Sequence, residues 1–161
     1  MRLEQVILAA LLGVAVPAAA ASGQSGHADV RSPLPQSARE AAAVVDAFHA
    51  ALRRGDTRAA AALLAEDASI FESGEAERSK AEYAAHHLGA DAEFSKAVPA
   101  SVTRRSGGAA GIFAWISSEG RTTGTFKGKA LDRLTTETMV LRHTGGGWKI
   151  EHIHWSSAAA K

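Results

Sequence analysis

The segment that most constrains the fold lies near the C-terminus, at residues 148–156, directly after three glycines. It is typical of a β-strand, in which successive side chains point to opposite faces. On that alternation, one face would carry Trp148, Ile150, His152 and His154, and the other Lys149, Glu151, Ile153 and Trp155. Packing alone does not require two imidazoles after an apolar pair. We therefore expect the first half of this strand to lie in a core, and His152 and His154 to line a cavity.

Two helices and a short strand are predicted before this point. Residues 37–40 (Ser-Ala-Arg-Glu) form a capping box, in which the serine caps a helix and the glutamate reaches back to it. Apolar residues then recur at helical spacing until Gly55 ends the run. Asp56 is the expected N-cap of a second helix that continues to Leu64. Residues 68–72 are predicted to form a strand, with Ala68, Ile70 and Glu72 on one face.

The rest of the chain predicts a third helix and then a meander of long strands. The helix covers residues 79–97, with Gly89 as its candidate break. Strands are expected over residues 100–105, 111–125, 131–143 and 148–156, joined by turns at 107–108, 126–129 and 145–147. Helices segregated from such a sheet make an α+β domain. We expect a cone-shaped fold, with three N-terminal helices packed on a strongly curved mixed or antiparallel sheet and a cavity between them.

Length and composition indicate one exported domain. A chain of 161 residues with 46% hydrophobic and 22% charged residues is long enough for one domain with a proper core. Residues 1–21 are predicted to be a signal peptide, the alternative being an uncleaved anchor. A disordered linker (22–36), the folded domain (37–157) and a short tail (158–161) would follow. The absence of cysteine excludes disulfides and thiolate chemistry. Export to a bacterial periplasm is the expected localisation.

Residues 48–56 and 63–70 resemble, without a gap, a pattern of the nuclear transport factor 2-like superfamily. Within that superfamily the chain is most similar to the SnoaL-like and ketosteroid-isomerase-like group. The closing residues 147–150, with His152 and His154, also resemble many members, including the association domain of calmodulin-dependent kinase. The resemblance covers about residues 38–157. It implies the α+β cone, but this fold carries enzymes, binding proteins and assembly modules alike.

The resemblance also implies roles for single residues. Glu72 stands where the isomerases have the carboxylate that removes a proton beside a carbonyl. Phe48 stands at the position of a tyrosine that stabilises the oxyanion, and it cannot donate a hydrogen bond. The second donor's position falls near Met139, with Thr138 close by. One lost donor costs roughly 3 kcal/mol of transition-state stabilisation. We therefore predict that the protein does not isomerise ketosteroids.

These observations define a candidate pocket between the first helix and the inner face of the sheet. Its predicted catalytic residues are Glu72, His152 and His154. Its predicted ligand-binding residues are Phe48, Tyr83, His86, His87, Trp115 and Met139. His86 and His87 are neighbours on one helix, so only one of them can point inward. No metal or other cofactor is predicted, although histidines that converged with Glu72 would be credible zinc ligands.

Three functions remain open from the sequence. The leading one is binding of an unknown small apolar molecule, with acid-base chemistry of the isomerase or lyase kind by Glu72 and a histidine. The alternatives are a non-catalytic dimerisation or assembly module and a metal-binding protein. A homodimer is expected, with Ile153 and Trp155 at its interface, and His49 and His143 are expected to be exposed. The near-balanced charge, 18 basic against 17 acidic residues, makes nucleic acid an unlikely partner. After signal cleavage, no membrane contact is expected.

Overall fold

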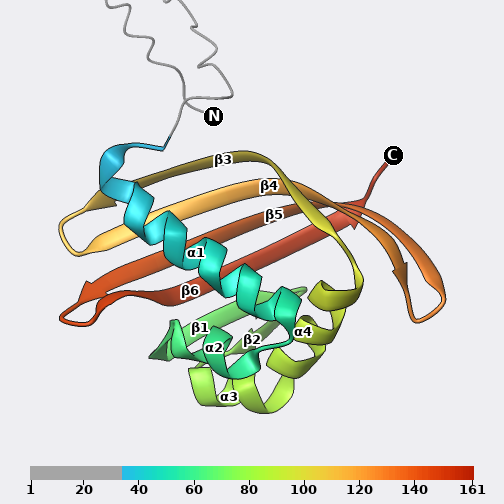
Figure 1. The fold of residues 1–161 in the computed structure, drawn as a ribbon, viewed down its shortest axis with the longest axis horizontal. Helices are drawn as coiled ribbons and strands as arrows, with labels where there is room; N and C mark the ends of the chain where they lie inside the picture. The colour runs from blue at the N-terminus through green and yellow to red at the C-terminus, as the bar shows by residue number, and fades with distance from the viewer. Residues whose placement is uncertain (1–33) are drawn as a thin grey trace, which may run out of the picture.

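A computed structural model describes residues 34–161, so the predicted signal peptide and nearly all of the predicted linker lie outside the described residues. The described part contains helices followed by long strands, as expected for an α+β domain (Figure 1). The elements are α1 (Gln36–Arg54), α2 (Thr57–Ala62), β1 (Leu64–Glu72), β2 (Glu75–Glu77), α3 (Lys80–His86), α4 (Leu88–Ala97), β3 (Ala100–Ala110), β4 (Phe113–Phe126), β5 (Lys129–Thr144) and β6 (Gly147–Ala159). None of these helices is long and apolar enough to cross a membrane.

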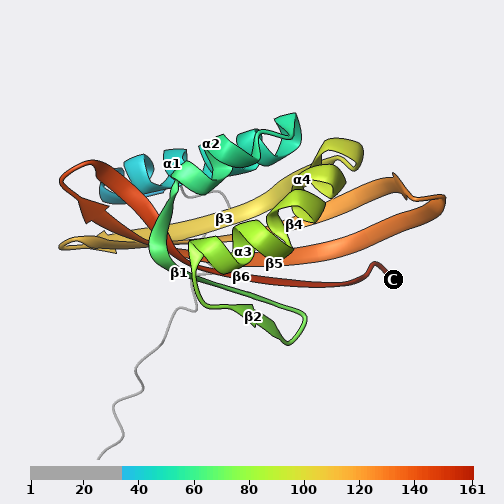
Figure 2. The ribbon, with the colours of Figure 1, turned by 90° about the horizontal axis from the view of Figure 1, so that it is seen from below.

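The six strands form one mixed sheet in the order β2-β1-β6-β5-β4-β3. Strands β3 to β6 make an antiparallel meander, and β1 joins it by pairing in parallel with β6. Helix α1 crosses over the meander, and α1 and α2 lie on one side of the sheet (Figures 1 and 2). We call the face of the meander toward these helices the inner face and the opposite one the outer face. Alternate side chains of each strand point to one face or the other.

Of the four helix starts, ends and breaks predicted from the sequence, two are confirmed and two are wrong. Gly55 ends α1 in the left-handed conformation, with φ of 73°, and Asp56 caps α2 by accepting a hydrogen bond from the Ala59 amide at 2.9 Å. The predicted capping box is wrong, because α1 begins one residue before Ser37 and its N-cap is Pro35, without a side-chain hydrogen bond. The third predicted helix is two helices, and the break lies at His87 rather than Gly89.

The predicted turn at Gly107-Gly108 is also wrong. Strand β3 continues through both glycines to Ala110, and the chain turns at Gly111, where φ is 58°. Gly107 is needed there because of close packing: a Cβ atom would lie 2.8 Å from Ile116 Cδ1 and 2.8 Å from the Trp115 carbonyl oxygen. By contrast, the predicted hairpin at residues 126–129 is confirmed, with positive φ at Lys127 and Gly128.

A β-bulge in β6 reverses the predicted faces of its second half. Leu141 on β5 pairs with Ile150, but the next residue, Val140, pairs with His152, so Glu151 is an extra residue on β6. As a result, Ile150 and Ile153 are both fully buried on the helix side of the sheet. The Glu151 carboxylate pairs with Arg142 on the neighbouring strand. The extra residue moves the next side chains to the face opposite to the one that strict alternation gives them.

The bulge overturns two predictions. Trp155 does not point away from the helices: its ring stacks near Phe48 of α1, with centroids 6.3 Å apart, and Ile153 is in the core, so neither is available for the predicted dimer interface. His152 and His154 lie on the outer face instead. His152 there contacts Ser69, at 2.9 Å between Nδ1 and Oγ, and the ring of Phe71.

Candidate functional site

A pocket of about 550 Å³ lies between α1, α4 and the inner face of β4, β5 and β6. We call it the main pocket. Its surface is mainly apolar, with polar groups concentrated at separate places on its wall. The wall includes His49, Leu52, Arg53, Glu72, Ala90, Asp91, Phe94, Val98, Thr122, Phe126, Leu131, Arg133, Thr135, Glu137 and Trp155. A hollow of this size and character suits a small organic molecule.

Two carboxyl groups, those of Glu72 and Asp91, form the acidic end of the main pocket. Glu72 is an exposed residue at the end of β1, but the pocket wall removes part of the water around its carboxyl, and this desolvation raises the pKa of the group. The nearby negative charge of Asp91 raises the pKa further, against a smaller opposing effect of His87. Burial also raises the pKa of Asp91, although the Tyr83 hydroxyl donates to its Oδ2 at 2.7 Å. Both carboxyl groups therefore have a higher pKa than ordinary carboxyls do.

A smaller hollow of about 210 Å³ lies behind the acidic end and shares Glu72 and Asp91 with the main pocket. Tyr83 and His87 contribute to its wall. Burial and the Asp91 charge raise the pKa of the Tyr83 phenol, which keeps this group protonated as a donor. His87 pairs with Glu77 through Nδ1 and with Glu75 through Nε2, the latter at 3.3 Å.

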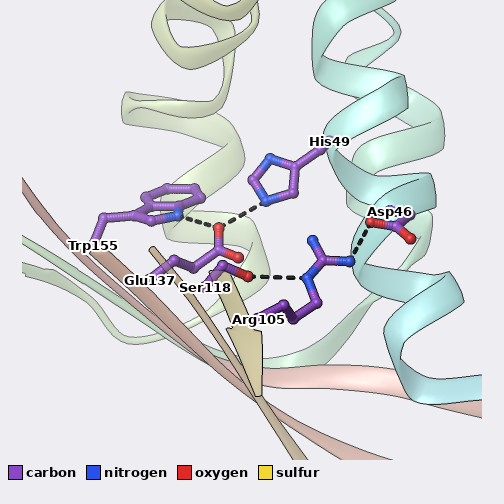
Figure 3. A network of polar contacts seen from close by, with 6 residues as sticks. All are labelled: Asp46, His49, Arg105, Ser118, Glu137 and Trp155. Atoms are coloured by element: carbon purple, nitrogen blue, oxygen red, sulfur yellow. Dashed lines mark hydrogen bonds and ion pairs between the residues drawn. The ribbon is translucent and has the colours of Figure 1, made fainter. Parts of the chain in front are cut away.

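A second carboxylate, Glu137 of β5, is only 9% exposed. Its Oε2 accepts a hydrogen bond from Trp155 Nε1 at 2.7 Å and lies 2.7 Å from His49 Nε2 (Figure 3). Burial alone would raise the pKa of Glu137, but the hydrogen bond and charge of His49, the Trp155 indole and the Arg105 charge outweigh it and hold the pKa below its ordinary value. The buried Oε1 accepts no hydrogen bond from the described residues.

Arg105 of β3 forms a second set of polar contacts with the first helix, beside that of Glu137. Its Nε donates to Ser118 Oγ at 3.1 Å, and its Nη1 lies 2.7 Å from Asp46 Oδ1 of α1 (Figure 3). Helix α1 is thus joined by polar contacts to β3 and β5, whose Arg105 and Glu137 in turn bond to Ser118 of β4 and Trp155 of β6. Glu137, Ser118 and Trp155 can meet because they lie directly opposite one another in the strand register.

Among the residues predicted from the sequence, Glu72 alone lines the main pocket; Tyr83 and His87 line the smaller hollow. Phe48 and Met139 point inward as expected, but both are fully buried in the core. Trp115 is 47% exposed on the outer face, because its neighbours Ala114 and Ile116 take the inward positions of β4. His86 is exposed on α3.

The histidines predicted to converge are kept apart. His152 and His154 occupy the outer face, His86 is exposed, and His87 pairs with β2, so Glu72 meets neither strand histidine. No group of three metal-ligating side chains occurs within residues 34–161. The geometry on which the catalytic prediction for His152 and His154 rested is therefore wrong. A role for them would require a substrate on the outer face.

Four functional candidates were missed: His49, Asp91, Glu137 and Trp155. His49 was expected to be exposed, yet its side chain is 30% exposed and lies against the main pocket. A signal for Glu137 was present in the sequence, because it alternates with the apolar residues Met139 and Leu141 and so belongs to a buried row. Trp155 was unpredictable from local alternation because the bulge precedes it.

Comparison with known families agrees with this geometry. The sequence model of the SnoaL-like domain matches residues 41–160, which is most of the described chain. The chain belongs to the SnoaL-like domain family. This confirms the resemblance drawn from residues 48–70, and the described helices and sheet are an α+β fold of the NTF2-like kind. No protein of curated function matches the SnoaL-like chain.

Several solved structures are similar to the SnoaL-like chain. A "putative ketosteroid isomerase" from Shewanella frigidimarina NCIMB 400 shares 37% identity, with a TM-score of 0.72 over 77% of this chain and 100% of that one. A "putative calcium/calmodulin dependent protein kinase II association domain" from Xanthomonas campestris shares 26%, with a TM-score of 0.64 over 79% and 93%. A "putative dehydratase from the NTF2-like family" from Streptomyces avermitilis shares 19%, with a TM-score of 0.62 over 77% and 97%, and supports the fold alone.

Proposed function

We propose that this SnoaL-like protein binds a small, mainly apolar molecule in the main pocket and exchanges a proton with it through Glu72. The observation that carries the proposal is a carboxyl group of raised pKa at the edge of a mainly apolar pocket of about 550 Å³. A base is most effective when its pKa approaches the working pH, which burial and a neighbouring carboxyl favour at Glu72.

The chemistry that suits such a group is removal of a proton from carbon beside a carbonyl, as in isomerases and lyases. The description of the Shewanella relative, 37% identical, supports the same class of reaction. Ketosteroid isomerisation itself is not expected, because Phe48 and Met139, at or near the two positions where the isomerases have their oxyanion donors, are fully buried and donate no hydrogen bond there. Turnover of a 5-ene-3-ketosteroid would contradict this expectation.

The proposal is tested with 2-tetralone, a bicyclic ketone of suitable size whose protons beside the carbonyl exchange with D₂O. Wild-type protein should accelerate this exchange, followed by proton NMR, above the protein-free rate. Glu72→Gln should still bind the ketone but lose the acceleration, while Glu119→Gln, which changes an exposed acid outside the main pocket, should keep it. Acceleration by Glu72→Gln equal to that of wild type would overturn the role of Glu72.

An assembly function is the second candidate, supported by apolar side chains on the outer face of the sheet. Phe71, Phe113 and Trp115 are each more than 40% exposed. Trp115 pairs in register with Val140, and Val140 with His152, whose ring contacts Phe71, so these four residues form a continuous row across four strands. Phe113 lies beside the row, two residues from Trp115 on β4. Burial of this row against a second copy would give a symmetric homodimer.

Export to the periplasm also remains a proposal. Residues 1–21 have the charged start, apolar run and small residues of a signal peptide. Expression of the full chain in a Gram-negative host should give a periplasmic protein whose mass lacks these residues. Full-length protein retained in the cytoplasm or the membrane fraction would contradict the proposal.

A further inference from the structure

His49 and Glu137 form a hydrogen-bonded pair on the wall of the main pocket, in addition to Glu72, and a pair of this kind can transfer a proton. His49 lies on α1, and its Nε2 is 2.7 Å from the buried Glu137 carboxylate. Trp155 Nε1 donates to the same oxygen at 2.7 Å, so the carboxylate is fixed from two sides. A carboxylate accepts hydrogen bonds, which places the proton of a neutral imidazole on Nε2.

With the proton on Nε2, the second ring nitrogen of His49, Nδ1, is left to contact a molecule in the main pocket. Figure 3 shows this nitrogen turned away from Glu137. No side chain among residues 34–161 bonds to it, and the His49 side chain is 30% exposed against the main pocket. In the neutral ring Nδ1 accepts a hydrogen bond, and in the protonated ring it donates one. An imidazole held in this way by a buried carboxylate is suited to general acid-base chemistry.

We propose that His49 exchanges a proton through Nδ1 with an oxygen atom of the molecule bound in the main pocket, and that Glu137 is the positioning residue that orients the ring. This proposal rests on the proposed function and extends it to a substrate class: a mainly apolar compound bearing a carbonyl oxygen at the His49 side. His49 directly follows Phe48, the residue that stands at the isomerases' donor position but is buried in the core. Helical rotation gives His49 the access to the pocket that Phe48 lacks.

The proposed step balances without a further reactant. Glu72 takes a proton from the carbon beside the carbonyl, and the electron pair of that C–H bond forms the C=C bond of an enol. The carbonyl oxygen takes the proton from Nδ1 of protonated His49, which becomes neutral. In D₂O the proton on Glu72 is replaced by a deuteron from the solvent, and return of that deuteron to the same carbon gives an exchanged ketone, while return to a conjugated carbon gives an isomerised one. Return of the hydroxyl proton to His49 restores both groups.

Charged groups of several elements lie on the same helix as His49 or on the wall of the same pocket. Asp46 and Arg53 share α1 with His49, Arg105 of β3 contacts Asp46, Arg133 lines the pocket from β5, and Glu72 and Asp91 form its acidic end. A purely structural role of the His49–Glu137 pair has to be separated from the proposed one. A pair that only joined α1 to the sheet would affect stability. It would not change the rate of proton exchange in a folded protein.

The test measures exchange of 2-tetralone in D₂O for His49→Gln, Glu137→Gln and the double variant, each shown to be folded by circular dichroism. His49→Gln should lower the rate about 10²-fold. Glu137→Gln should lower it less, and the double variant should be no slower than His49→Gln, because the two residues act as one unit. His143→Gln, which changes an exposed histidine of β5, is the matched control and should exchange like wild type.

A spectroscopic measurement separates orientation from stability. At a pH at which the His49 ring is neutral, nitrogen-15 NMR of histidine-labelled wild type should show its single ring proton on Nε2, and Glu137→Gln should lose this preference. If Glu137→Gln does not fold, Trp155→Phe, which removes one of the two donors to the carboxylate, replaces it in both measurements.

The outcomes distinguish the two proposals. Exchange by wild type that is lost in Glu72→Gln but unchanged in His49→Gln would overturn the role of His49 and leave the proposed function standing. Unchanged nitrogen-15 signals in Glu137→Gln would overturn the positioning role. Wild-type protein without any acceleration of exchange would overturn the proposed acid-base function and this proposal with it.

Discussion

Two glutamates on the wall of one pocket have pKa values shifted in opposite directions. The Glu72 carboxyl lies at the pocket edge, where partial desolvation and another carboxyl raise its pKa. Glu137 is buried but accepts two hydrogen bonds and faces cationic groups, so its pKa is lowered. The direction depends on the partners of the charged form rather than on burial alone. Such divergence assigns different tasks to groups of the same chemical type: Glu72 suits proton transfer, and Glu137 suits a fixed charge.

The raised pKa of Glu72 predicts the pH dependence of proton exchange. Only the ionised carboxyl is a base, so on the acidic side of the pH profile the rate should rise with pH through a midpoint above the ordinary value of 4.5. Rates of 2-tetralone exchange measured from pH 4 to 8 test this. Asp91→Asn removes the neighbouring negative charge that raises the Glu72 pKa, and should move the midpoint to lower pH. A midpoint that stayed in place would show that Asp91 does not influence Glu72.

The lowered pKa of Glu137 predicts a pH-dependent contribution to stability. A carboxyl with a lower pKa in the folded than in the unfolded protein stabilises the fold above its unfolded pKa, and this contribution is lost as pH falls through the folded pKa. At pH 7, Glu137→Gln should therefore lower the free energy of unfolding by about 1.5–3 kcal/mol. The difference from wild type should shrink below pH 4.5, the ordinary value, in urea unfolding experiments. A difference independent of pH would contradict an ionised Glu137.

At the scale of elements, single residues in the strands decide which side chains reach the pocket. In β4 the alternation is regular: Ala114, Ile116 and Ser118 point inward and Trp115 outward. In β6 the extra residue Glu151 interrupts it, and Trp155 reaches Glu137 only for that reason. Gly107 allows β3 to pass close to Ile116 of β4. Local pairing irregularities thus determine the composition of the site.

The close approach at Gly107 predicts a specific loss of stability. Gly107→Ala places a methyl group 2.8 Å from the Trp115 carbonyl oxygen, and this backbone atom cannot move without disturbing the β3–β4 pairing. Overpacking of this kind costs roughly 1–3 kcal/mol. Gly145→Ala is the matched control, because nothing lies within 4 Å of its added methyl group. Urea unfolding of the two variants should separate them clearly, and equal stabilities would refute the packing argument.

At the scale of the whole molecule, the two faces of the sheet differ in what they carry. The face of the sheet toward α1 and α4 encloses the main pocket, and the outer face carries the exposed row that includes Phe71 and Trp115, with Phe113 beside it. A site and an association surface can therefore coexist on one sheet, because alternate side chains of the same strand supply them. Changes on one face should leave the chemistry of the other intact.

This separation predicts the effect of a charge on the outer face. If two copies associate through the exposed row, Trp115→Glu should convert a dimer into a monomer, since like charges would meet across the symmetric interface. Sedimentation equilibrium measures the change, and Lys129→Glu at the exposed hairpin tip is the control. Exchange of 2-tetralone by the monomer should continue. A dimer that persists in Trp115→Glu would exclude this face as the interface.

The sequence determined the order of the elements apart from β2 and the division of the third helix, and also the ends at Gly55 and Asp56, the hairpin at residues 126–129 and the family. Periodicity, caps and turns are local properties. The sequence also placed Glu72 beside the pocket through an ungapped family pattern. Tertiary structure alone decided that Trp155 and His49, rather than His152 and His154, meet a carboxylate inside. The extra residue Glu151 in β6 sends all later side chains of that strand to the opposite face of the sheet. The position of such a bulge depends on the pairing with β5, so the periodicity of β6 alone does not reveal it.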